Sequence, residues 1–106
     1  MSDNVTVSYV HDLIKKGQDF VFVDVRNPDE YALCSIKGTK LIPMGELGHR
    51  LNEIPKDKLV VLHCHHGGRS MRAVNFLKGQ GYDQVKNLEG GIDRWSIEID
   101  QNVPRY

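Results

Sequence analysis

The chain has 106 residues, of which 40% are hydrophobic and 26% are charged, and its 14 basic residues balance its 14 acidic ones. That length predicts a single domain over residues 1–106. A zero net charge argues against nucleic acid as a partner, and no apolar run approaches the ~20 residues of a membrane span. No signal-peptide pattern opens the sequence, so both cysteines are expected to be free thiols in a reducing compartment, the cytoplasm.

The apolar pattern alternates between short continuous runs and longer helical stretches. Ser8 is predicted to cap the first helix, which Gly17 ends, and Asn27-Pro28 opens the second. In the fourth helix Phe76 is expected to face the core beside its apolar neighbours, and Trp95 is also expected there. Strands are predicted at residues 5–7, 20–25, 39–42, 58–64 and 85–88, and helices at residues 8–17, 27–31, 44–54, 69–80 and 91–99.

This alternation predicts an α/β fold with a central, mostly parallel five-stranded sheet and helices on both of its faces. Ligands bind beyond the carboxyl ends of the strands in such sheets. Two predicted strand ends carry reactive or charged residues, Asp24 to Arg26 and His63-Cys64. These ends are the candidate functional positions.

The segment from His63 to Ser70 joins a buried strand to a helix. Gly67 and Gly68 let the backbone turn tightly, so that successive N–H groups can converge on one point. The N-terminus of the helix adds its partial positive charge there. Cys64 is therefore expected to have a lowered pKa and to be a nucleophilic thiolate, and Arg69 would reinforce the effect if its side chain turned inward.

The spacing of Cys64, Gly67, Arg69 and Ser70 resembles the active-site loop of the rhodanese family of single-domain sulfurtransferases. Further segments resemble other motifs of that family in the same order, and the last of them resembles the tail of rhodanese domains fused behind sulfur-carrier-activating enzymes. These segments are VDVRNPDEY (23–31), KGTKLIP (37–43), EGGIDRW (89–95) and IDQNVPRY (99–106). The resemblance implies a three-layer rhodanese-like fold.

The resemblance also implies a mechanism that needs no cofactor. The Cys64 thiolate would take a sulfane sulfur from a small donor such as thiosulfate, become a persulfide, and pass the sulfur to a thiol or protein acceptor. The anion- or persulfide-binding loop would consist of His65, His66, Gly67, Gly68, Arg69 and Ser70.

Two positions depart from the family pattern. Cys34 and Ser35 stand where the family usually has Gly-His, and His65 and His66 stand where the thiosulfate enzymes carry two basic residues. Both changes leave the nucleophile in place and bear on whether thiosulfate is the physiological donor. One of the two histidines could face the donor and the other solvent.

His63 could be a general base, but strand alternation places Leu62 and Cys64 on one face of the sheet and His63 on the other. A structural role is therefore predicted for His63. No metal site is expected from residues 63–66, because four contiguous ligands cannot readily surround a tetrahedral ion.

Asp24 ends a buried strand and needs a partner. A hydrogen bond or ion pair with Arg26 or with loop amides would brace the site, a structural role rather than a catalytic one. Cys34 is predicted to be a packing residue; the alternative is a resolving thiol that condenses with oxidised Cys64.

Two other functions remain open. Phosphatases and arsenate reductases also use a loop with a cysteine and an arginine, but theirs has five residues between the two, whereas four lie between Cys64 and Arg69. The smaller loop fits a single sulfur better than a tetrahedral oxyanion. The second alternative is a non-catalytic persulfide carrier or a docking module in a sulfur-transfer pathway.

Overall fold

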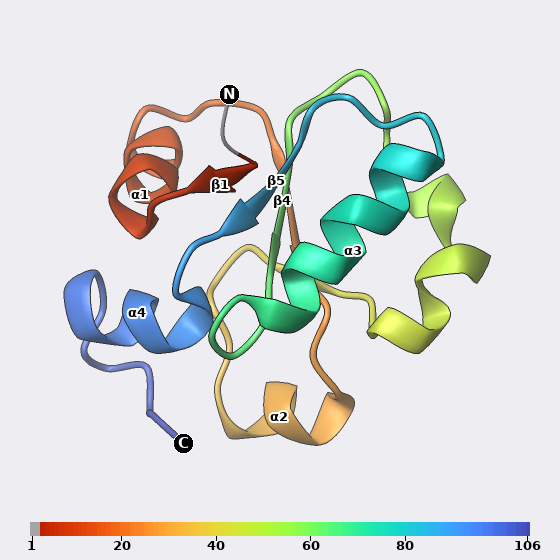
Figure 1. The fold of residues 1–106 in the computed structure, drawn as a ribbon. Coiled ribbons are helices and arrows are strands. Elements are labelled where there is room, and N and C mark those ends of the chain that lie inside the picture. The colour runs from red at the N-terminus through yellow and green to blue at the C-terminus, as the bar shows by residue number, and fades with distance from the viewer. Residues whose placement is uncertain (1–2) are drawn as a thin grey trace.

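The computed structural model describes residues 3–106, and its centre is a five-stranded sheet in which every strand pair is parallel (Figure 1). The strand order is β1-β5-β4-β2-β3. The predicted α/β class and parallel five-stranded sheet are therefore confirmed. The strands are β1 (Asn4–Val5), β2 (Val21–Asp24), β3 (Lys40–Leu41), β4 (Val60–His63) and β5 (Val85–Leu88).

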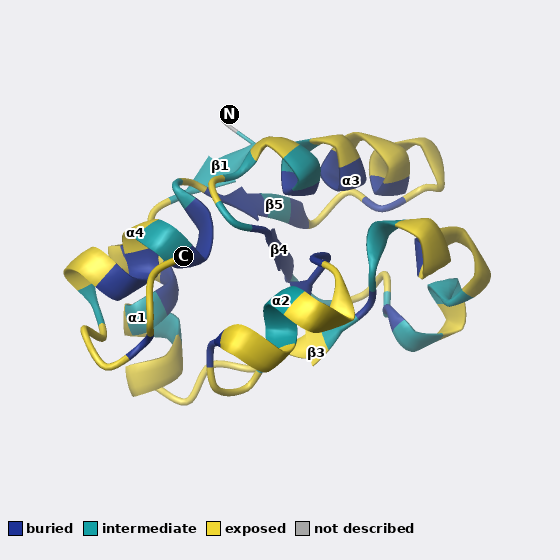
Figure 2. Ribbon diagram, turned by 90° about the horizontal axis from the view of Figure 1, so that it is seen from below, coloured by how far each residue is buried: buried dark blue, intermediate teal, exposed yellow. Residues whose placement is uncertain are grey.

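Helices cover both faces of this sheet, as the alternating pattern predicts (Figures 1 and 2). On one face α3 (Gly68–Gly79) buries Ala73, Val74 and Leu77 against β2 and β4. On the other face α1 (Val7–Lys15) and α4 (Gly91–Glu98) pack together, and Trp95 is buried there as expected. A short helix, α2 (Pro28–Leu33), follows β2.

The stretch 44–54 differs from its prediction as one helix. It forms two 3₁₀ segments, η1 (Met44–His49) and η2 (Leu51–Glu53). Leu47 and Ile54 still reach the core, so the apolar spacing was interpreted correctly. Gly45 and Gly48 weaken α-helix propensity, which favours the shorter turns.

The start of the first helix also differs from its prediction. Thr6, not Ser8, is the N-cap, and its hydroxyl accepts a hydrogen bond from the Tyr9 N–H at 3.0 Å. The helix therefore takes Val7 from the predicted strand 5–7. The other predicted elements are present, with ends shifted by at most a few residues.

Phe76 was wrongly assigned to the core, since 41% of it is exposed. The buried stripe of α3 runs through Ser70, Ala73, Val74 and Leu77, which follows helical spacing. Phe76 lies beside this stripe and approaches Gly48 of η1 instead. None of the helices in the described part of the chain has the length and apolar character needed to cross a membrane.

Candidate active site

Cys64 lies directly after β4, where the carboxyl ends of β2 and β4 meet, because Asp24 and His63 are paired in the register of these strands. The loop 64–67 then turns into α3 through Gly67, which has a φ of 118° that only glycine adopts readily. The sequence therefore correctly predicts the strand, the tight loop and the helix start around this cysteine.

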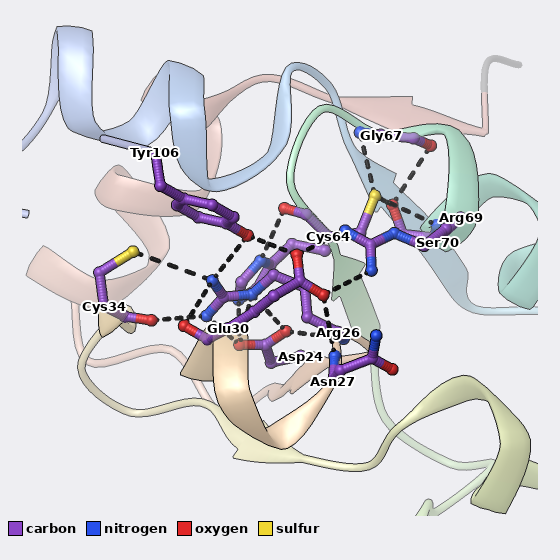
Figure 3. A network of polar contacts seen from close by, with 11 residues as sticks. Asp24, Arg26, Asn27, Glu30, Cys34, Cys64, Gly67, Arg69, Ser70 and Tyr106 are labelled. Atoms are coloured by element: carbon purple, nitrogen blue, oxygen red, sulfur yellow. Dashed lines mark hydrogen bonds and ion pairs between the residues drawn. The ribbon is translucent and has the colours of Figure 1, made fainter. Parts of the chain in front are cut away.

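The Cys64 sulfur lies among hydrogen-bond donors of its own loop (Figure 3). The Gly67 N–H is 3.1 Å from Sγ, the Ser70 N–H is 3.4 Å away and the Ser70 hydroxyl 3.3 Å away. Burial, the largest influence, raises the pKa of the Cys64 thiol, but hydrogen bonds from Ser70, Gly67 and Arg69 together hold it below its ordinary value. This geometry stabilises a thiolate.

The first turn of α4 donates backbone hydrogen bonds to the carbonyl groups of the same loop. The Ile92 N–H donates to the Cys64 carbonyl at 3.0 Å, and the Asp93 N–H donates to the His65 carbonyl at 3.1 Å. Gly91 makes this approach possible, because a Cβ there would stand 2.5 Å from both carbonyl oxygens. The glycine pair at the start of α4, Gly90 and Gly91, is therefore part of the support of the cysteine loop.

Asn87 of β5 was not predicted from the sequence as part of the site. Its side-chain oxygen accepts a hydrogen bond from the Ser70 hydroxyl, and its amide donates to Asn4 Oδ1 at 2.9 Å. Asn87 is buried. It fixes the side chain of Ser70 beside the sulfur, a role that no local pattern around a β5 asparagine signals.

His63 lies on the other face of the sheet from the sulfur, as strand alternation predicts. Its ring packs edge-on against Phe22, and its Nδ1 lies 3.2 Å from the Cys64 carbonyl oxygen. Complete burial, the dominant influence, lowers the pKa of the His63 imidazole. The ring is therefore neutral and part of the core.

Asp24 and Arg26 form a fully buried ion pair. Arg26 Nε lies 2.9 and 3.1 Å from the two carboxylate oxygens, and Nη2 lies 2.6 Å from Asp24 Oδ2. The remaining Arg26 protons go to the carbonyls of Glu30 and Cys34 and to the Tyr106 hydroxyl at 3.0 Å. The pair therefore ties the end of β2 to α2 and to the tail of the chain, beneath the cysteine loop (Figure 3).

Arg69 makes a bidentate pair with Glu30 of α2, with nitrogen–oxygen distances of 2.7 and 2.9 Å. The sequence left open that the Arg69 guanidinium turns toward the sulfur. In the structure it is instead paired with Glu30. Tyr106 completes the arrangement, because its hydroxyl donates to Glu30 Oε2 at 2.7 Å. Sequence analysis did not assign Glu30 or Tyr106 to the site.

The chain as a whole matches the family model of the rhodanese-like domain over residues 6–98. The chain belongs to the rhodanese-like domain family. A sulfurtransferase of Allochromatium vinosum is 43% identical over 79 residues, which cover 74% of this chain and 74% of that protein. The crystal structure of a rhodanese-like domain protein from Staphylococcus aureus superposes with a TM-score of 0.85 at 29% identity, covering 100% of this chain and 99% of that one.

Another relative is a larger protein. The rhodanese-like/PpiC domain-containing protein 12 of Arabidopsis thaliana is 37% identical over 108 residues. The match covers 92% of this chain but only 36% of the plant protein. A rhodanese-like domain of this kind is therefore also found joined to a second domain.

The two histidines that follow Cys64 differ in environment. The His65 ring stacks on Tyr106 at 3.9 Å and on His66 at 3.9 Å, whereas the side chain of His66 is 67% exposed. Burial, ahead of the neighbouring His66, lowers the pKa of His65. His65 is thus a neutral ring held in a stack, and His66 faces solvent.

Only one group of side chains among residues 3–106 has the spacing to hold a metal ion. Potential ligand atoms of His65, His66 and Asp93 lie within 4.8 Å of one another. Asp93 already accepts a hydrogen bond from Arg105 at 2.8 Å, and the two imidazoles face each other in a stack. The residues 63–66 do not form such a group together.

Cys34 lies directly after α2, as its C-cap residue. It is a free, buried thiol, and its sulfur lies 3.9 Å from Arg26 Nη1. Cys34 belongs to the core cluster beneath α1 and α4, whereas Cys64 belongs to the cluster beneath α3. This placement supports a packing role and gives no support to direct condensation of the two thiols.

Proposed function

We propose that this rhodanese-like domain is a sulfurtransferase that carries sulfane sulfur as a persulfide on Cys64. The observation that carries the proposal is the set of donors around the Cys64 sulfur, which stabilises the attacking thiolate. The sulfurtransferase among its relatives supports the same class of reaction.

In the first step the Cys64 thiolate attacks the outer sulfur of a donor such as thiosulfate. A bond forms between Sγ and that sulfur, the donor's sulfur–sulfur bond breaks, and its electron pair leaves with sulfite. In the second step a thiolate of a small molecule or a protein attacks the terminal sulfur, and the electrons of the broken bond return to Sγ. No metal or organic cofactor is required by these steps, and no proton transfer from His63 is needed.

A hollow at the surface would receive the donor. It is lined by Cys64, His65, His66, Gly68, Arg69 and Arg72. A sulfur attached to Sγ would extend from the donors of the loop toward this opening. The four residues between Cys64 and Arg69 make the loop one residue shorter than that of the phosphatases and arsenate reductases, so we expect no hydrolysis of an aryl phosphate.

Intact mass spectrometry tests the proposal. The reduced protein and a Cys64→Ser variant are incubated with excess thiosulfate or with an organic persulfide and freed of small molecules. We expect the mass of one sulfur atom on the wild type alone, and its loss on addition of cyanide. If neither donor adds sulfur, Cys64 is not a sulfur carrier and a docking module becomes the better description.

A persulfide carrier that does not turn over by itself is the second candidate. The plant relative supports it in one respect, because a similar domain is there one part of a longer protein and need not turn over by itself. Such a carrier would accept sulfur in the mass experiment yet release it to cyanide only once, or slowly, without multiple turnovers.

A further inference from the structure

The mouth of the proposed active site carries little net positive charge. Arg69 and Arg72 are the charged side chains among the residues that line it, and Arg72 is exposed on α3. An exposed, solvated arginine contributes only weakly to binding an anion. His65 adds no charge at neutral pH, because burial lowers its pKa. Arg69 is therefore the main candidate to hold an anionic donor.

Arg69 is already neutralised by Glu30. Both terminal nitrogens of the guanidinium are directed at the two carboxylate oxygens, at 2.7 and 2.9 Å. Such a fork-to-fork pair uses the same geometry with which an arginine would grip a sulfonate group. A donor that needs this arginine must compete with a carboxylate of the protein itself.

The Glu30 carboxylate is fixed in place and stays charged. It also accepts hydrogen bonds from the Asn27 N–H at 3.1 Å and from the Tyr106 hydroxyl at 2.7 Å, and only 15% of its side chain is exposed. The hydrogen bond from Arg69, the strongest influence, holds the pKa of Glu30 at about 2. Glu30 is thus a permanent negative charge against Arg69, which lines the mouth together with Cys64.

The balance of charge then disfavours a dianion. Apart from the solvated Arg72, Cys64 as a thiolate and Glu30 each contribute one negative charge, and Arg69 contributes one positive charge. A donor with one negative charge meets a net charge of minus one, and thiosulfate brings a second negative charge that has no free partner. In this partly buried setting each unmatched charge raises the energy of the bound donor.

We infer that Glu30 is a specificity-determining residue, which makes this site favour singly charged sulfane-sulfur donors, such as thiosulfonates and organic persulfides, over the dianion thiosulfate. The inference rests on the proposed function of Cys64. The preference for singly charged donors follows from the bidentate Glu30–Arg69 pair, because this pair uses the guanidinium that a dianion would need.

Methanethiosulfonate is the matched probe, because it presents the same outer sulfur as thiosulfate with one charge fewer. The Cys64 thiolate attacks this sulfur, the bond between the two sulfur atoms breaks, and methanesulfinate leaves with the electron pair. Thiosulfate reacts identically and releases sulfite. Charge and atoms balance in both reactions, which differ only in the charge of the group at the mouth.

The test compares steady-state sulfur transfer from both donors to cyanide in the wild type and in Glu30→Gln. Glutamine keeps the size and the acceptor oxygen of Glu30 but removes its charge. We expect KM for thiosulfate to fall about tenfold in Glu30→Gln, and KM for methanethiosulfonate to change by less than about threefold. Glu53→Gln is the matched control, since Glu53 pairs with Arg50 at 2.6 Å and with Lys40 at 2.7 Å rather than with an arginine that lines the mouth.

A structural defect would instead raise KM or lower kcat for both donors alike. Equal changes in KM for the two donors, or an unchanged KM for thiosulfate, would show that Glu30 does not determine donor specificity. Neither result would contradict the proposed persulfide on Cys64. If neither donor loaded the wild-type cysteine, the proposed function itself would fall.

A measurement on the wild type alone guards against misfolding of the variant. Added salt screens the repulsion between Glu30 and the donor, so KM for thiosulfate should fall more than KM for methanethiosulfonate as the salt concentration rises. The opposite order would count against the inference.

Discussion

Ser70 contacts the Cys64 sulfur twice, through its backbone N–H at 3.4 Å and through its hydroxyl at 3.3 Å. The hydroxyl lies between the sulfur and the side-chain oxygen of Asn87, which accepts from it. One serine thus joins the start of α3, the Cys64 sulfur and strand β5. The reactivity of Cys64 should respond directly to changes at this residue.

Replacing Ser70 by alanine removes the hydroxyl, whose single proton points either to Asn87 Oδ1 or to the sulfur 3.3 Å away. The change should raise the pKa of the Cys64 thiol, because the thiolate loses a donor that can turn toward it. We expect alkylation of Cys64 by iodoacetamide to slow by roughly threefold to tenfold at neutral pH and to recover as the pH is raised. Ser8→Ala, at an exposed position of α1, is the control. An unchanged profile of alkylation rate against pH would show that the hydroxyl does not stabilise the thiolate.

Replacing Gly91 by alanine should displace the cysteine loop. The new methyl group would stand 2.5 Å from the carbonyl oxygens of Cys64 and His65, at a φ of 59°. We expect a loss of at least about 2 kcal/mol in the free energy of unfolding, measured with urea, together with slower persulfide formation. A Cβ at Gly79 would meet no atom within 4 Å, so Gly79→Ala should not lower the free energy of unfolding. Equal stabilities of the two variants would contradict the packing described.

The Asp24–Arg26 pair should matter most when only one partner is removed. Arg26→Met leaves a buried carboxylate without its cation and is expected to lower the free energy of unfolding by about 3–5 kcal/mol. Adding Asp24→Asn should restore part of that loss, because the uncompensated charge disappears. Urea unfolding of both variants checks this, and a double variant less stable than Arg26→Met would refute it.

Glu30 should stabilise the fold in a pH-dependent way. Its pKa of about 2 lies below the ordinary value of 4.5, so its contribution is fully present above pH 4.5 and is lost as the pH falls through about 2. The wild type should exceed Glu30→Gln in free energy of unfolding by on the order of 2 kcal/mol at neutral pH, and this difference should vanish in strong acid. Glu89→Gln, at an exposed position, serves for comparison. A difference that stays constant with pH would be incompatible with the Arg69 pair.

Tyr106→Ala should uncover the ring of His65, which Tyr106 covers at 3.9 Å with an interplanar angle of 6°. Burial is the main reason that the pKa of His65 is lowered, so exposure should raise it toward the ordinary value of an imidazole. NMR titration of the histidine rings measures the change, with Tyr9→Ala, exposed on α1, as the control. A pKa of His65 that did not rise would show that the stack does not bury the ring.

The parts of this site that sequence analysis predicted are local along the chain. Gly67 and Ser70 lie three and six positions from Cys64 in their hydrogen bonds to the sulfur, and Arg26 lies two positions from Asp24. A strand, a short glycine-containing loop and a helix restrict such neighbours to a small volume. The apolar pattern predicted the parallel sheet in a similar way, because the periodicity within each short segment shows which of its sides is buried.

The remaining contacts depended on how the layers pack. Arg69 meets Glu30 across 39 positions, Arg26 meets Tyr106 across 80, and Ser70 meets Asn87 across 17. Hydrophobic periodicity does not predict contacts between polar side chains so far apart in the sequence, because each of these side chains could equally lie in solvent on its own helix or strand. Their partners exist because α2, β5 and the tail all reach the carboxyl end of one sheet. The sequence by itself determined the position of Cys64 and the form of its loop, and only the tertiary structure decided which charged side chains lie near them.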